Sequence, residues 1–138
     1  MCLGIPATPC ETSRELESQG DGYSVYCKRG RREAKEDRFS ASIELQGDSK
    51  KAFFGVFDGH GGAKASEFAA QKLEKNILDE LVRIKDETTV KEVVKQGYLK
   101  TDAEFSKEDD ASGGTCCVTA LIQNPNLVVS NAAIAVLF

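Results

Sequence analysis

The chain has 138 residues, of which 41% are hydrophobic and 29% charged, a composition typical of a folded globular domain. Its 22 acidic residues outnumber its 18 basic ones, and this acidic balance argues against nucleic acid as the main partner. No apolar run approaches the roughly 18 residues that span a bilayer, so no membrane partner is expected. The N-terminus lacks the features of a secretory signal, and the five cysteines lack zinc-ligand spacing. We therefore expect reduced thiols in a protein of the cytoplasm or the nucleus.

The first third of the sequence predicts a leader followed by short strands. Residues 1–21 hold two of the three prolines and few bulky apolar residues, which predicts a flexible leader before a short strand over Tyr23–Lys28. Alternating apolar and polar residues over Phe39–Gln46 predict a half-buried strand. The nearly continuous apolar run Ala52–Phe57 predicts a strand covered on both faces, ending at Asp58.

The remainder of the sequence predicts two helices and a hairpin. Apolar residues recur at spacings of three and four over Ala65–Ile84, and Thr89 forms a capping box with Glu92 at the start of a second helix. Cys116–Ile122 and Leu127–Asn131 flank a turn and are expected to pair as a hairpin, with one of the two adjacent cysteines in the core. This order of elements predicts an α+β fold with antiparallel neighbours.

The sequence stops shortly after this hairpin. The last seven residues, Ala132–Phe138, carry no charge and predict an open apolar edge of a sheet.

Candidate chemistry is concentrated where the apolar run 52–57 ends. Asp58 directly follows this strand, so a rigid element would fix its position. Gly59 lets a metal ion or a phosphate approach the backbone closely, and its carbonyl is a possible oxygen ligand. The glycines that follow do not form a dinucleotide fingerprint, because position 64 is Lys64, and the chain has no P-loop lysine motif.

A second acidic pair, Glu36 and Asp37, lies before the alternating strand and follows Arg32. If the two strands were neighbours, Glu36 and Asp58 could face one cleft. Carboxylates, carbonyls and water are the ligands that Mg²⁺ and Mn²⁺ prefer, and a pair of such ions can activate water against a phosphate ester. The Arg32 guanidinium could then bind the phosphate at two points.

Each of these residues also has a more ordinary interpretation. An Asp followed by Gly, such as Asp58, is most commonly a turn residue. A lone loop histidine such as His60 is usually a surface residue, and Arg32 belongs to a run of basic residues that solvent could simply surround. The spacing alone leaves both interpretations open.

Together the motifs resemble a known family. R-x-x-x-E-D-R-F over 32–39, F-G-V-F-D-G-H-G-G over 54–62 and S-G-G-T over 112–115 resemble the metal-dependent protein phosphatase 2C family, in particular its plant members. The resemblance covers residues 23–132. It implies an α+β sandwich of antiparallel sheets flanked by helices, of which residues 22–138 would be a truncated, N-terminal half.

The resemblance also implies a metal site. Two Mg²⁺ or Mn²⁺ ions would be bridged by Asp58, and the Gly59 carbonyl and Glu36 would ligate one of them. The substrates would be phosphorylated serine and threonine residues of proteins.

The remaining site residues would act on water and substrate. By the resemblance, Asp37 would orient the attacking water, Arg32 would hold the substrate phosphate and His60 would protonate the leaving oxygen. The implied activity is that of a protein serine/threonine phosphatase.

The sequence departs from the family pattern in ways that raise an alternative. The family domain is longer and has further acidic ligands in the part that this chain lacks. Asn131-Ala132-Ala133 stands where the family has an N-A-G-D turn, and Lys35 stands where an apolar residue is usual. The alternative is a catalytically impaired fragment that acts as a binding or regulatory module.

Overall fold

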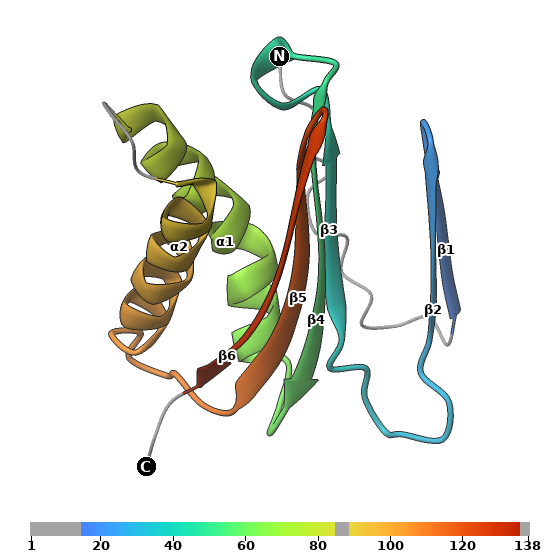
Figure 1. Ribbon diagram of the computed structural model, residues 1–138. Helices are drawn as coiled ribbons and strands as arrows, with labels where there is room; N and C mark the ends of the chain where they lie inside the picture. Colours follow the sequence, from blue (N-terminus) through green and yellow to red (C-terminus); the bar gives the residue numbers. More distant parts are fainter. Residues whose placement is uncertain (1–14, 85–88, 136–138) are drawn as a thin grey trace.

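The computed structural model describes residues 15–84 and 89–135, which form two antiparallel sheets and two helices. Helices α1 and α2 cover one face of a four-stranded sheet, and a two-stranded sheet stands on the other side (Figure 1). The α+β class and the antiparallel pairing are confirmed. The smaller sheet pairs β1 (Glu15–Gly20) with β2 (Tyr23–Lys28); the larger one has the order β3 (Arg38–Ile43), β4 (Lys51–His60), β5 (Gly114–Gln123) and β6 (Asn126–Ala135).

Strand β1 lies inside the segment predicted as a flexible leader. It pairs with β2 in register from Glu15–Lys28 to Gly20–Tyr23, so the described fold begins before Tyr23. The sequence did not indicate this strand because Glu15–Gly20 is mostly polar, and the strand is held by backbone pairing. Residues 1–14 of the predicted leader lie outside the described residues.

The two helices follow the predicted apolar periodicity. Helix α1 spans Lys64–Arg83 and helix α2 spans Val90–Phe105. The Thr89 side chain accepts a hydrogen bond from the Glu92 backbone N–H, as the predicted N-cap requires. Neither helix among the described residues is long and apolar enough to cross a membrane.

Strand β3 ends earlier than the alternating pattern predicted. Glu44 and Gln46 have positive φ angles of 52° and 56°, so the chain leaves the strand and makes a short 3₁₀ turn, η1, over Leu45–Gly47. Leu45 is nonetheless buried, because this turn folds its side chain back into the core. The alternation of apolar residues in the sequence therefore continued through Leu45, although the backbone had already left the strand.

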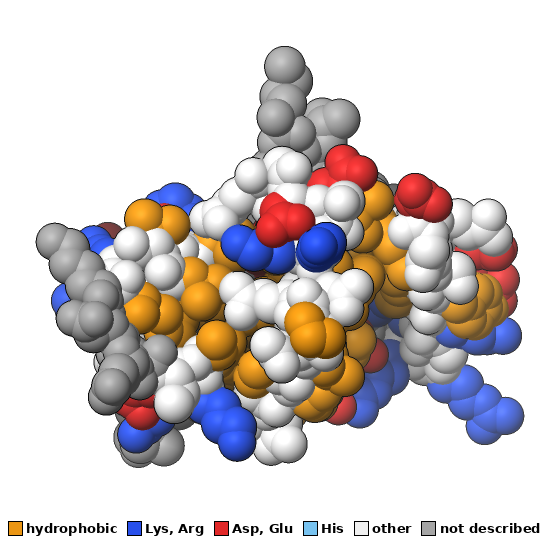
Figure 2. Space-filling view, turned by 45° about the horizontal axis from the view of Figure 1, so that its top comes forward, with side chains coloured by type: hydrophobic (Ala, Val, Ile, Leu, Met, Phe, Trp, Pro, Cys, Tyr) orange, Lys and Arg blue, Asp and Glu red, His pale blue; other side chains and the backbone are white. Residues whose placement is uncertain are grey.

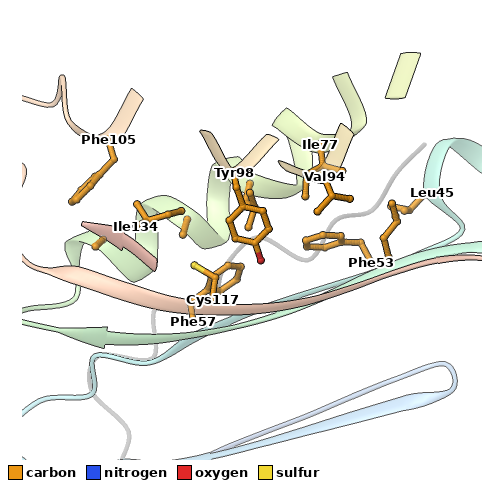
Figure 3. Packing of buried hydrophobic residues seen from close by; sticks show 13 residues of the cluster. Leu45, Phe53, Phe57, Ile77, Val94, Tyr98, Phe105, Cys117 and Ile134 are labelled. Carbon is orange, nitrogen blue, oxygen red and sulfur yellow. The ribbon is translucent and has the colours of Figure 1, made fainter. Parts of the chain in front are cut away.

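The core lies between the larger sheet and the helices. Phe53 and Phe57 of β4 point towards Ile77 of α1 and towards Val94 and Tyr98 of α2 (Figure 3). The cluster also contains four residues from η1, β5 and β6, namely Leu45, Cys117, Leu121 and Ile134.

The paired strands β5 and β6 confirm the predicted hairpin and extend it at both ends. Cys117 is buried and Cys116 is exposed, as the alternation predicted, and burial raises the pKa of the Cys117 thiol to about 12. The uncharged tail predicted an edge strand, and β6 lies at the edge of the larger sheet up to Ala135, where the described residues end. Ile134 of this strand nonetheless packs into the core. Residues 136–138 lie outside the described part.

The face of the sheet opposite the helices carries hydrophobic side chains (Figure 2). Tyr23 contacts Phe54 edge-on, with ring centroids 5.4 Å apart, and a cavity of about 290 Å³ lies between β2 and this face. Val56 and Val118 are 60% and 53% exposed. The prediction that the strand 52–57 is covered on both faces is therefore wrong, because the β1–β2 sheet reaches only part of this face.

The close packing of the two helices depends on Gly97. A Cβ atom at this position would overlap the Ile77 Cγ1 atom and lie 3.0 Å from the Ile77 Cα atom. We expect Gly97→Ala to lower the free energy of unfolding by about 1–3 kcal/mol, although alanine is the better helix former. Urea denaturation measures the change. The control is Ala103→Gly at an exposed position of α2, which should cost about 1 kcal/mol by helix propensity alone. A Gly97→Ala variant as stable as the parent would contradict this packing.

Glu74 of α1 is a half-buried carboxylate that accepts a 2.8 Å hydrogen bond from the Ser42 hydroxyl of β3. Burial raises the pKa of Glu74, and the Ser42 hydrogen bond lowers it in part. The folded state therefore binds the proton more tightly than the unfolded state, and this carboxyl contributes less stability as the pH rises above about 4.3.

We expect Glu74→Gln to raise the free energy of unfolding at pH 7 by at most about 1 kcal/mol, with a smaller gain near pH 4. Denaturant unfolding of both proteins across this pH range measures the difference. A gain that does not depend on pH would show that ionisation of Glu74 is not its cause.

Candidate functional site

The acidic site begins at the end of β4, which continues through the predicted turn. Asp58, Gly59 and His60 pair with Cys116, Thr115 and Gly114 of β5, so the DGHGG segment is strand up to His60. The prediction that the strand ends at Asp58 was wrong because glycine-rich segments usually indicate turns. Alternation along β4 buries Phe57 and Gly59 on the helix side and exposes Asp58 and His60 on the other.

The acidic segment before β3 lies against the end of β4. A Cβ atom at Gly59 would overlap the Glu36 carbonyl oxygen and lie 2.9 Å from the Ser66 Oγ atom. Only glycine allows this approach, which brings two segments far apart in the sequence into contact.

The approach places the Asp37 and Asp58 carboxylates side by side. Asp37 is exposed overall, but partial burial raises the pKa of its carboxyl, and the charge of Asp58 and a hydrogen bond to it raise this pKa further. The Arg32 guanidinium and the backbone N–H of Gly59 act in the opposite direction. Two neighbouring carboxylates repel each other unless a proton or a cation lies between them.

Arg32 stands beside this acidic pair. Its Nη1 atom lies 4.0 Å from the Glu36 Oε2 atom, and its side chain is 74% exposed. The guanidinium is therefore close to both acidic residues of the segment and still accessible to an anion from solution.

His60 lies on the same face of β4 as Asp58, one step further along that face. A Cβ atom at Gly114 would lie 2.6 Å from the His60 Nε2 atom, so the imidazole ring rests over the Gly114 backbone. Gly113 adopts a φ of 73°, a conformation that glycine adopts readily, and lies next to the His60 carbonyl. No hydrogen bond or ion pair joins His60 to the acidic residues among those the structure describes.

The donor set suits one hard cation better than two. Asp37 and Asp58 lie together, but no group of three or more His, Cys, Asp or Glu side chains is close enough to hold a metal ion within residues 15–84 and 89–135. Two facing carboxylates and the Gly59 backbone can bind a single Mg²⁺ or Mn²⁺ whose other ligands are water. A second ion would need more protein oxygens than the described residues bring together.

Thus the structure brings Asp37, Asp58, Gly59 and the Glu36 backbone to one place, with Arg32 beside them. The Glu36 carboxylate does not join the two aspartates in a three-acid cluster, and His60 is one pair further along β4. The roles assigned to these residues stay predictions.

Three residues that hold the site had no predicted role. Arg38, Ser66 and Glu67 bond to the segment 35–37 or to one another, and two of them come from α1. Arginine and glutamate are seldom buried, so a sequence pattern places them at the surface by default. The signal that could have found Arg38 is the position of a charged residue at the start of a half-buried strand.

Comparison with known proteins fits this geometry. The family model for Protein phosphatase 2C matches residues 21–132. The chain belongs to the protein phosphatase 2C family. Probable protein phosphatase 2C 25 of Arabidopsis thaliana is 65% identical over 128 residues, which are 93% of this chain and 32% of that protein. Probable protein phosphatase 2C 32 of Oryza sativa subsp. japonica is 48% identical over 131 residues, which are 91% of this chain and 33% of that protein.

This protein phosphatase 2C chain therefore spans about a third of the length of these relatives. A solved structure described as a C. elegans sex determining protein covers 85% of this chain with a TM-score of 0.64 and 21% identity. The chain covers 28% of that structure. At this level of identity the likeness establishes the fold alone.

The carboxylate pair can be tested without any reaction. We expect Asp58→Asn to lower the pKa of Asp37, because the substitution removes the charge that opposes ionisation of Asp37. An NMR titration of the Asp37 carboxyl carbon in metal-free buffer measures this. The control Asp21→Asn changes an exposed acid in the turn between β1 and β2 and should leave the titration of Asp37 unchanged. An unchanged Asp37 titration in Asp58→Asn would contradict the facing pair.

Proposed function

We propose that the chain carries the metal- and phosphate-binding part of a protein serine/threonine phosphatase and hydrolyses phosphoserine and phosphothreonine. The observation that supports this most is the facing pair Asp37 and Asp58 beside the exposed Arg32, in a chain of the protein phosphatase 2C family. An acidic pair next to a basic fork provides separate sites for a cation and for a phosphate.

In this proposal Asp58, the Gly59 carbonyl and Glu36 would hold Mg²⁺ or Mn²⁺. The Glu36 carboxylate, which lies beside Arg32 in the structure, would turn towards the ion to join Asp58. Such an ion, when bound, lowers the pKa of water enough to supply a nucleophile near neutral pH. Asp37 orients the attacking water through its carboxylate, whose pKa is raised by partial burial and by the charge of Asp58, a charge that a cation would offset. The site suits Mg²⁺ or Mn²⁺ because every donor is an oxygen atom.

The substrate phosphate binds to the Arg32 guanidinium, which is exposed and can form two parallel hydrogen bonds to phosphate oxygens. His60, exposed on the same face of β4 as Asp58, donates a proton to the leaving serine or threonine oxygen. We place this activity in the cytoplasm or nucleus. Cys27, Cys116 and Cys117, which form no disulfide, are compatible with a reducing compartment.

The proposal is tested by hydrolysis of a phosphothreonine peptide by the 138-residue chain, with Mn²⁺ and with EDTA. We expect hydrolysis that requires the metal and that falls by at least about tenfold in Asp58→Ala, because removing a ligand should cost at least as much as removing an outer partner. Asp21→Ala, which removes an exposed acid from the turn between β1 and β2, should retain the parent activity. Circular dichroism shows whether each variant is folded. A folded parent chain without metal-dependent hydrolysis would refute the proposal.

The second candidate is a binding or regulatory module without full activity. It is favoured by the exposed hydrophobic face of the larger sheet, where Val56, Val118 and Val129 are each more than half exposed. Such patches are characteristic of interaction sites. The hydrolysis assay separates the candidates, because a folded but inactive chain would leave this one standing.

A further inference from the structure

We infer that Arg38, Ser66 and Glu67 form a clamp that positions the acidic segment 35–37 for cation binding. The inference rests on the proposed function only in treating Glu36 and Asp37 as part of a metal site. The clamp itself is defined by hydrogen bonds of the described residues.

The clamp engages three successive backbone carbonyls. The Arg38 Nη1 atom donates to the carbonyl oxygens of Lys35 and Asp37 at 2.8 and 3.0 Å. The carbonyl between them, that of Glu36, accepts a short hydrogen bond from the Ser66 hydroxyl. With three consecutive carbonyls bonded, the segment cannot rotate without leaving a buried polar group unpaired.

Helix α1 anchors the clamp. The Arg38 Nη2 atom lies 2.6 Å from the Glu67 Oε1 atom, and the Arg38 side chain is only 4% exposed. The Ser66 hydroxyl also lies 2.9 Å from the Ala63 carbonyl, just before the helix begins. A buried guanidinium needs a partner charge, so Glu67 holds Arg38 in place and Arg38 in turn holds the segment.

This arrangement fixes the distance between the two acidic motifs. Helix α1 starts at Lys64, four positions after His60, and its first turn contains Ser66 and Glu67. These two clamp residues are therefore close to Asp58 along the chain. Ser66 also lies against Gly59, where the Glu36 backbone approaches most closely. The clamp residues are positioning residues: they contact the backbone of the segment and leave its carboxylates free to bind.

The chain offers a matched control in Ser42 and Glu74. This pair also joins β3 to α1 through a 2.8 Å hydrogen bond, but Glu74 lies seven positions beyond Glu67 along the helix. Ser66→Ala can therefore be compared with Ser42→Ala, and Glu67→Gln with Glu74→Gln. In each comparison both variants lose the same chemical group from the interface of α1 with β3 and the segment just before β3. The clamp variant loses it near the acidic segment, and the control variant loses it away from that segment.

Two readouts test the clamp in the 138-residue chain. Hydrogen exchange followed by mass spectrometry should show peptides from residues 33–38 exchanging about fivefold faster in Ser66→Ala and Glu67→Gln, without a matching rise in β5 peptides. Titration calorimetry with Mn²⁺ should show a dissociation constant about tenfold higher in these two variants. Neither change should occur in Ser42→Ala or Glu74→Gln, which leave the segment clamped.

The possible results separate the clamp from the proposed function. Clamp variants that match the control variants in both readouts overturn the inference, and so does faster local exchange with unchanged Mn²⁺ affinity. If the parent chain binds no Mn²⁺, the proposed metal site is refuted. The hydrogen-exchange measurement is then the one test of whether the three residues hold the segment. A rise confined to residues 33–38 then shows that the three residues hold the segment backbone but overturns their role in cation binding, whereas a uniform rise across the chain refutes the clamp as well.

Discussion

The site depends on the close approach of the Glu36 backbone to Gly59. A side chain at position 59 would occupy the space of the Glu36 carbonyl, and the two acidic residues of that segment would move away from Asp58. Gly59 pairs with Thr115 of β5, whereas the β3–β4 ladder ends at Phe57, two positions earlier. The β5 ladder therefore fixes the position of Gly59. The absence of a side chain at this position, near the end of β4, thus determines where the carboxylates meet.

One face of strand β4 contributes to the core, and the opposite face contributes to the site. Phe53 and Phe57 are fully buried under the helices, whereas Asp58 and His60 project from the opposite face. Because the burial of the aromatic residues fixes the register, a slip by one position would bury the acid and expose the ring. The same packing energy that stabilises the fold therefore orients the acidic group. The repulsion between Asp37 and Asp58 acts against this packing and is tolerated because the strand cannot shift to relieve it.

Local patterns in the sequence predicted most elements, and long-range contacts account for the differences. The periodicity of α1 and the N-cap at Thr89 are properties of neighbouring residues and were found directly. The end of β3 was missed because the apolar alternation continues through Leu45, although the backbone has already turned. Strand β1 was missed because its polar residues are held by pairing with β2, which no local pattern encodes.

The site was predictable to a similar extent and for similar reasons. Asp58, Glu36 and Asp37 were identified from their motifs, and the structure brings the two aspartates together. The residues that hold them there, Ser66 and Glu67, are about 30 positions away from their partners Glu36 and Arg38. Spacing along a chain carries no information about such a bond. The carboxylates also share their face of the sheet with Val56 and Val118, which remain largely exposed to water. Since removing water strengthens every charge interaction, the affinity of this pair for a cation depends on how far that face is covered.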